Sequence, residues 1–70
     1  MNANAIRNLR LSLNLTQSDF ARLLCLSGPS HIAHLEAGRK APVGPLLALL
    51  QLLARRPELR EILEENATST

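Results

Sequence analysis

Apolar residues recur at helical spacing along most of this chain, and glycine, proline or capping residues interrupt them. Spacings of three and four residues place side chains on one face of an α-helix, and no segment alternates as a half-buried strand does. The pattern predicts a compact all-α fold of five helices, over residues 5–13, 17–25, 29–37, 45–55 and 57–65. Residues 66–70 lack an apolar anchor, so we expect a single domain of residues 1–65 followed by a frayed tail.

The length of 70 residues allows one domain with a modest core. Cys25 is the only cysteine, so no disulfide within the chain supports that core, and a lone thiol suits the reducing cytoplasm. The N-terminus shows no signal-peptide pattern, and the apolar run at 46–54 is too short to span a membrane. Small domains often gain stability by oligomerising, and we expect this here.

The charge is unevenly distributed along the chain. Residues 1–40 hold five Lys and Arg against two Asp and Glu, whereas residues 41–70 hold three against four. A basic first part suits a polyanion such as nucleic acid, and a nearly neutral second part suits contact with protein.

The leucine-rich second part predicts a homodimer. The helix expected at 45–55 is apolar on more than one face, which exceeds what one small domain can cover. We expect the apolar surface that the domain cannot cover to form a twofold contact between two copies of the chain. The residues assigned to this contact are Leu53, Leu59, Ile62 and Leu63.

The helix expected at 29–37 has two contrasting sides. Ile32, Leu35 and Glu36 share one side, and the opposite side holds only small or uncharged polar residues, with His31 on the flank: Ser30, Ala33, His34 and Ala37. A solvent-facing helix usually carries Lys and Glu there. A helix that enters the DNA major groove needs short side chains that reach base edges. This side therefore predicts a base-reading surface.

Cys25, His31 and His34 are the residues that suggest metal binding or catalysis. Their spacing matches no zinc motif and a fourth ligand is missing, so we expect no metal and no cofactor. No carboxylate nearby in sequence orients either histidine, and a chain this short has little room for a substrate cavity. We therefore expect a protein that is not an enzyme.

Two segments together resemble the Cro-and-lambdoid-repressor (XRE) family of helix-turn-helix proteins. Residues 15–24 read LTQSDFARLL and residues 32–42 read IAHLEAGRKAP. The similarity covers about residues 6–63 and implies a lambda-repressor-like fold. The longer turn, which contains Gly-Pro-Ser, and the ending LLALLQLLARRPELREIL are similar to the DNA-binding domain of MqsA-like antitoxins. Those antitoxins grip the toxin with an N-terminal zinc domain, which these 70 residues do not include, so the resemblance by itself does not imply toxin binding.

The resemblance implies roles for individual residues. It assigns Thr16 and Gln17, at the start of the second helix, and Arg39 and Lys40, after the third, to the DNA backbone. It assigns Ser30 and His34 to base reading, with His31 and Ala33 beside them. It implies an ion pair between Arg10 and Glu36. Cys25 stands where the family usually has glycine, which predicts a strained backbone or a shifted turn.

These observations predict a homodimeric repressor that binds a palindromic operator in double-stranded DNA and regulates its own operon. Two alternatives stay open. One is an antitoxin that holds a toxin protein and autoregulates. The other is a phage or mobile-element regulator of an operon of the anti-CRISPR type. The three differ in genomic setting and not in chemistry.

Overall fold

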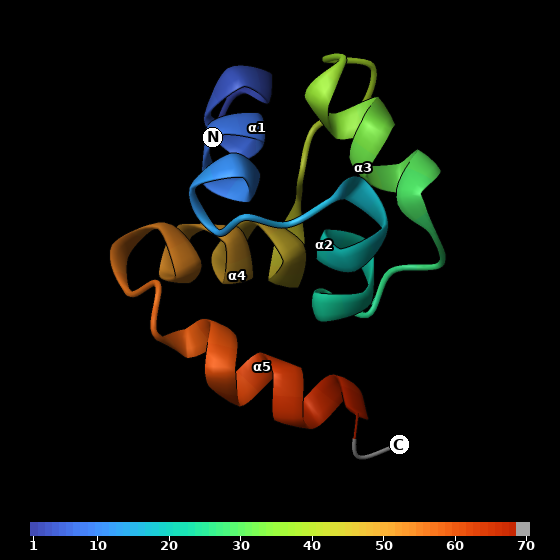
Figure 1. Cartoon of the computed structure of the whole chain (residues 1–70). Helices are drawn as coiled ribbons and strands as arrows, with labels where there is room; N and C mark the ends of the chain where they lie inside the picture. The colour runs from blue at the N-terminus through green and yellow to red at the C-terminus, as the bar shows by residue number, and fades with distance from the viewer. Residues whose placement is uncertain (69–70) are drawn as a thin grey trace.

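Helices make up most of the part of the chain that the structure describes, residues 1–68 of a computed structural model. These residues contain no strand, which confirms the all-α prediction. Figure 1 shows α1 and α3 above α4 and α2, with α5 along the base. The helices are α1 (Ala3–Ser12), α2 (Gln17–Leu23), α3 (Pro29–Glu36), α4 (Gly44–Arg55) and α5 (Leu59–Thr68).

Local side chains determine where the first three helices begin. The Asn2 side chain accepts a hydrogen bond from the Ala5 N–H at 2.8 Å, and Thr16 Oγ1 accepts one from the Asp19 N–H at 3.0 Å. Both bonds satisfy an N–H that has no partner inside its helix. Pro29 opens α3, where its missing N–H removes no helical bond. Thr16 is therefore the N-cap of α2.

The first three helices all end in the same way, with a Schellman motif. In each motif a residue with positive φ follows the last helical turn: Asn14 at 57°, Cys25 at 59° and Gly38 at 76°. The next N–H then returns to a carbonyl five residues earlier, as from Leu26 to Ala21 at 2.8 Å. Asn and Gly tolerate this conformation, whereas cysteine does not favour it. The strained backbone predicted at Cys25 is present.

The Schellman motif at Cys25 also makes α2 shorter than predicted. The positive φ at Cys25 stops the helix at Leu23. At the other end of the chain, α5 begins at Leu59 because Pro57 and Glu58 form a turn, and it continues to Thr68. The tail, which was expected to fray from residue 66, therefore continues the helix as far as residue 68. Within it, Asn66 Nδ2 donates to Cys25 Sγ at 3.8 Å. Residues 69–70 lie outside the described part.

We predict that Cys25→Gly stabilises the fold. Glycine removes a left-handed penalty of about 1–2 kcal/mol and costs about 0.5–1 kcal/mol in backbone entropy, so the net gain is about 1 kcal/mol. Thermal unfolding should then show a midpoint about 5 °C higher. Cys25→Ala is the matched control, since it also removes the thiol and keeps the penalty. An equal gain in both variants would contradict the explanation.

The core lies where α1, α2, α3 and α4 meet. Phe20 is the only aromatic residue, and its side chain is 0 % exposed. Each fully buried Leu, Ile or Phe contributes about 1.5–3 kcal/mol relative to exposure. The buried apolar residues are Ile6, Leu9, Leu13, Phe20, Ala21, Leu23, Leu24, Ile32, Leu35, Leu50 and Leu53.

The burial of Leu53 corrects the predicted dimer surface. Its side chain is 0 % exposed inside the single chain, so the assignment of Leu53 to a contact between copies is wrong. Leu59 and Leu63 are half-buried and pack against the core. Ile62 remains 62 % exposed, and Leu52, which the assignment omitted, is 50 % exposed. The large apolar side chains left exposed on α4 and α5 are therefore Leu52 and Ile62.

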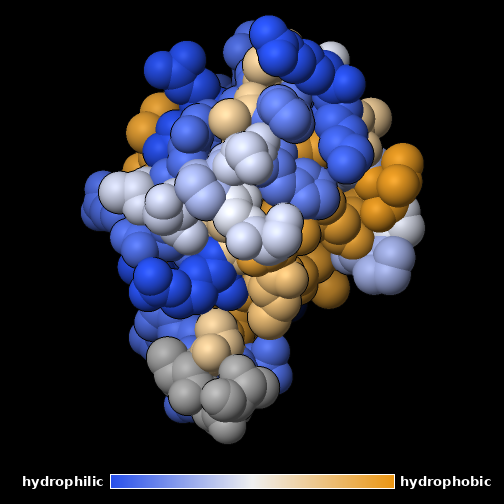
Figure 2. Space-filling model, turned by 90° about the vertical axis from the view of Figure 1, so that its right-hand side faces the viewer, coloured by the Kyte–Doolittle hydropathy of each residue, from blue (hydrophilic) through white to orange (hydrophobic). Residues whose placement is uncertain are grey.

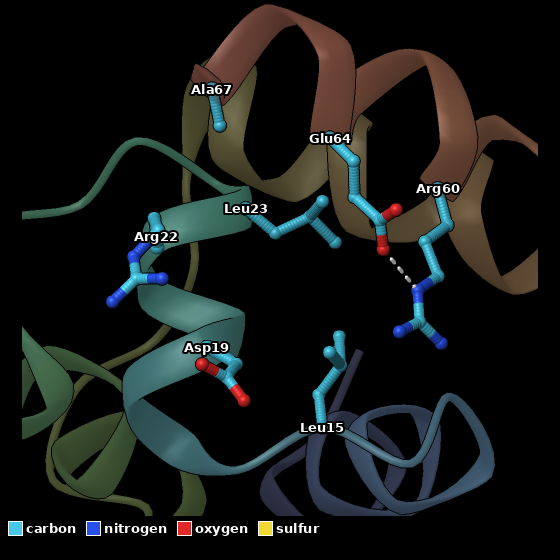
Figure 3. A pocket seen from close by; sticks show the side chains of 7 residues that line it. All are labelled: Leu15, Asp19, Arg22, Leu23, Arg60, Glu64 and Ala67. Atoms are coloured by element: carbon cyan, nitrogen blue, oxygen red, sulfur yellow. Dashed lines mark hydrogen bonds and ion pairs between the residues drawn. The ribbon is translucent and has the colours of Figure 1, made fainter.

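Arg60 fastens α5 to the rest of the molecule. Its guanidinium donates to the Leu13 carbonyl, in the turn after α1, and its Nε lies 2.6 Å from Glu64 Oε1. Figure 3 shows this pair at a groove of about 280 Å³ between α2 and α5. The groove is lined by Leu15, Asp19, Arg22, Leu23, Arg60, Glu64 and Ala67. Arg60 therefore holds α5 close to the residues that precede α2.

Candidate nucleic-acid interface

The two sides of α3 are separated as the sequence predicts. Ile32 and Leu35 are 0 % and 1 % exposed, so α3 is held in the fold by its apolar side. On the other side the predicted base-reading residues Ser30 and His34 are exposed, as is Ala37. Figure 2 views the molecule from the side on which α3 lies in Figure 1 and shows weakly and strongly hydrophilic residues over much of this face.

His31 and Ala33 are less accessible than the other predicted base-reading residues. Both are half-buried, at the margins of the exposed side of α3. The surface available without any rearrangement is therefore narrower than predicted and is formed chiefly by Ser30, His34 and Ala37.

Arg10 and Glu36 form a nearly buried ion pair with two hydrogen bonds. Arg10 Nε lies 2.6 Å from Glu36 Oε2, and Arg10 Nη2 lies 3.1 Å from Glu36 Oε1. The side chains are 12 % and 7 % exposed. A third bond, from Arg10 Nη1 to the Leu15 carbonyl, measures 3.0 Å. One guanidinium thus joins α1, the segment before α2, and the end of α3.

The environment of Glu36 keeps its carboxylate ionised. Burial raises the pKa of Glu36. Hydrogen bonds from Arg10 and Gln17 and the charges of Arg10 and Arg7 lower the pKa by more than burial raises it, so the net pKa lies below its usual value. The hydrogen bond to Glu36 raises the pKa of Arg10, against the effect of burial. Both groups therefore stay charged at neutral pH.

Gln17 has a contact that sequence reasoning missed. Its Nε2 donates to Glu36 Oε1 at 3.4 Å, and the side chain is half-buried. An amide nitrogen carries two N–H groups, so one remains for a DNA phosphate. Thr16 uses its hydroxyl to cap α2. No local pattern marks the contact between Gln17 and Glu36, because the two residues are 19 positions apart.

Arg39 and Lys40 lie in the exposed loop after α3. The Schellman motif at Gly38 determines the direction of this loop, because the Arg39 N–H returns to the His34 carbonyl at 3.0 Å. Gln17 reaches the same end of α3 through its contact with Glu36. The C-terminal end of α3 therefore gathers three of the four residues assigned to the DNA backbone.

Two further observations concern other classes of site. Across residues 1–68, no three His, Cys, Asp or Glu side chains lie close enough together to hold a metal ion. Within the same residues, no helix combines the length and the apolar character that crossing a membrane requires.

Comparison with known protein families gives one match. The helix-turn-helix family matches residues 6–59, which is more than half of the chain and includes α2 and α3. No curated protein shows significant similarity to the chain.

Proposed function

The chain belongs to the XRE-type helix-turn-helix family of DNA-binding transcription regulators, and from this premise we propose that it is a homodimeric repressor of its own operon. The observation that carries the proposal is the exposed side of α3, where Ser30, His34 and Ala37 leave this side of the helix without long charged side chains. Such a helix can approach base edges in the major groove of double-stranded DNA.

Base reading is assigned to α3. His34 is exposed and can donate a hydrogen bond to guanine N7 or O6, and Ser30 can bond to several bases. Ala33 suits packing against a thymine methyl group. Sequence preference would then come from these contacts, because phosphates are alike along the duplex.

We assign contact with the DNA backbone to the first turn of α2 and to the loop after α3. The first turn of α2 has N–H groups without helical partners and a partial positive charge, which favour a phosphate. Gln17 adds an amide N–H at the same place, and Arg39 and Lys40 add positive charge after α3. These contacts would determine the orientation of α3 in the groove.

The dimer contact is assigned to α4 and α5, which pack against each other. Leu52 and Ile62 expose apolar surface that a second copy would cover. A twofold dimer presents two α3 helices about 34 Å apart, one turn of DNA, and therefore binds two inverted half-sites.

Binding selection from random duplex DNA tests the operator. We expect enrichment of a palindrome with half-sites one helical turn apart. Enrichment of one isolated half-site would reject the dimeric mode. No enrichment, with equal affinity for all duplexes, would reject a sequence-specific regulator.

We predict that Leu52→Lys and Ile62→Lys each shift the chain from dimer to monomer in sedimentation experiments. A charge placed in an apolar contact is costly, so operator affinity should fall about tenfold or more. Leu11→Lys on α1 is the matched control, since Leu11 and Leu52 are each 50 % exposed. Dissociation caused by Leu11→Lys, or unchanged mass in both test variants, would contradict the assigned contact.

The same apolar surface also suits a different protein, which keeps the antitoxin alternative open. A toxin that covers Leu52 and Ile62 would replace the second copy of this chain. A purified chain that stays monomeric at high concentration, and forms a stable complex with the product of a neighbouring gene, would support the antitoxin. A dimer that binds the promoter of its own operon would support the repressor.

A further inference from the structure

Arg7 lies on the part of α1 that faces the end of α3. Ile6 and Leu9 are buried and fix the rotation of α1 about its axis. Residues three apart in a helix lie on neighbouring positions of one face, so Arg7 lies one turn from Arg10. Arg10 reaches Glu36, the last residue of α3, at 2.6 Å.

The charge of Arg7 is not neutralised by the fold. Arg7 is exposed, and among the residues that the structure describes no ion pair includes it. The nearby carboxylate is Glu36, whose two oxygens already accept from Arg10. The positive charge of Arg7 still helps to lower the pKa of Glu36, which indicates that the guanidinium lies close to this end of α3.

Two further cations flank the same end of α3. Arg39 and Lys40 follow Glu36 by three and four positions, and both are exposed. Figure 2 shows strongly hydrophilic residues at the top of the molecule, where Figure 1 places the C-terminal end of α3. α1 and the loop after α3 thus contribute a shared basic rim of Arg7, Arg39 and Lys40.

We infer that Arg7 contacts a phosphate of the DNA backbone, so that α1 forms part of the DNA interface. The inference rests on the proposed function, because it requires α3 to lie in the major groove. The phosphates of both strands line the edges of that groove, and the end of an inserted helix lies beside one edge. An exposed arginine without a partner needs little desolvation to bind there, and its planar group matches phosphate geometry.

The salt dependence of DNA binding tests the inference. Each phosphate neutralised by a cation adds about 0.9 to the slope of log affinity against log salt concentration. Arg7→Ala should therefore lower the slope by about 0.9. This corresponds to binding about fivefold weaker than wild type at 0.15 M salt, and to almost no difference in affinity at 1 M salt. The loss should be equal on the operator and on random duplex, and Arg7→Lys should retain most of the affinity.

Arg55→Ala is the matched control. Arg55 is an exposed arginine at the C-terminal end of α4, which Figure 1 shows on the opposite side of the molecule from α3. This variant makes the same change in net charge and should keep the wild-type slope. Equal slopes for Arg7→Ala and Arg55→Ala would overturn the role of Arg7.

The same measurements separate the inference from the proposed function. Wild-type chain that binds its operator, combined with an unchanged slope in Arg7→Ala, refutes the inference alone. Wild-type chain without affinity for any duplex refutes both. Equal thermal midpoints for Arg7→Ala and wild type would show that a lower slope does not come from unfolding.

Discussion

Replacing Glu36 with alanine is expected to lower the free energy of unfolding by about 3 kcal/mol. The substitution leaves the nearly buried guanidinium of Arg10 without its carboxylate, and breaking a buried pair from one side typically costs 3–5 kcal/mol. It also removes the acceptor of Gln17. Small domains are stable by only about 5–15 kcal/mol, so much of the stability would be lost. Urea unfolding measures the change.

The exposed pair of Arg56 and Glu58 provides the control. Its closest atoms are 3.8 Å apart and its side chains are 74 % and 66 % exposed. Surface pairs of this kind contribute about 0–1 kcal/mol, so Glu58→Ala should change the stability little. A loss below 1 kcal/mol in Glu36→Ala would show that the buried pair does not stabilise the fold.

The lowered pKa of Glu36 gives this stabilisation a pH dependence. A carboxyl group with a folded-state pKa below its unfolded value, here near 4.5, contributes stability that is complete above the unfolded value. That contribution is lost as pH falls through the folded-state pKa. As pH falls below 5, wild type should therefore lose more stability than Glu36→Gln. Parallel curves of unfolding free energy against pH would contradict this expectation.

Substitution of His34 by alanine is expected to weaken operator binding by about 1–3 kcal/mol, or about 5–150-fold, the range for loss of a good base contact. Binding to random duplex should change little, because phosphates carry no sequence information. His34 is exposed and outside the core, so thermal stability should be unchanged. Competition titration with operator and random duplexes measures the difference.

Gln51→Ala on α4 provides the comparison for His34→Ala. Gln51 is also an exposed polar residue in a helix, and it lies outside α2 and α3. This variant should bind operator and random DNA as wild type does. If His34→Ala weakened binding equally on both duplexes, base reading would have to be assigned to another surface.

The helix-turn-helix was predictable because its determinants are local. Thr16 caps α2 and Gly38 ends α3 through hydrogen bonds between residues at most five positions apart, and Pro29 opens α3 through its own backbone, which lacks an N–H. The sides of α3 follow from helical spacing alone. The left-handed residue at Cys25 was foreseen only through the resemblance, because cysteine carries no turn preference of its own.

Long-range packing explains what the sequence did not show. Leu52 and Leu53 are neighbours in one apolar run, and only the packing of α4 against the other helices decides which of the two is covered. The contact between Gln17 and Glu36 likewise depends on how α2 and α3 cross. The extension of α5 to Thr68 was missed because Asn66 contacts Cys25, 41 positions away.

The side chains on the exposed side of α3 lie outside the parts that hold the fold together. Ser30, His34 and Ala37 belong neither to the buried core nor to the pair of Arg10 and Glu36. Substitutions at these three positions would redirect the chain to new operators at little cost in stability. A family built on this arrangement can diversify its targets by a few point mutations, and this chain is a suitable scaffold for designing such changes.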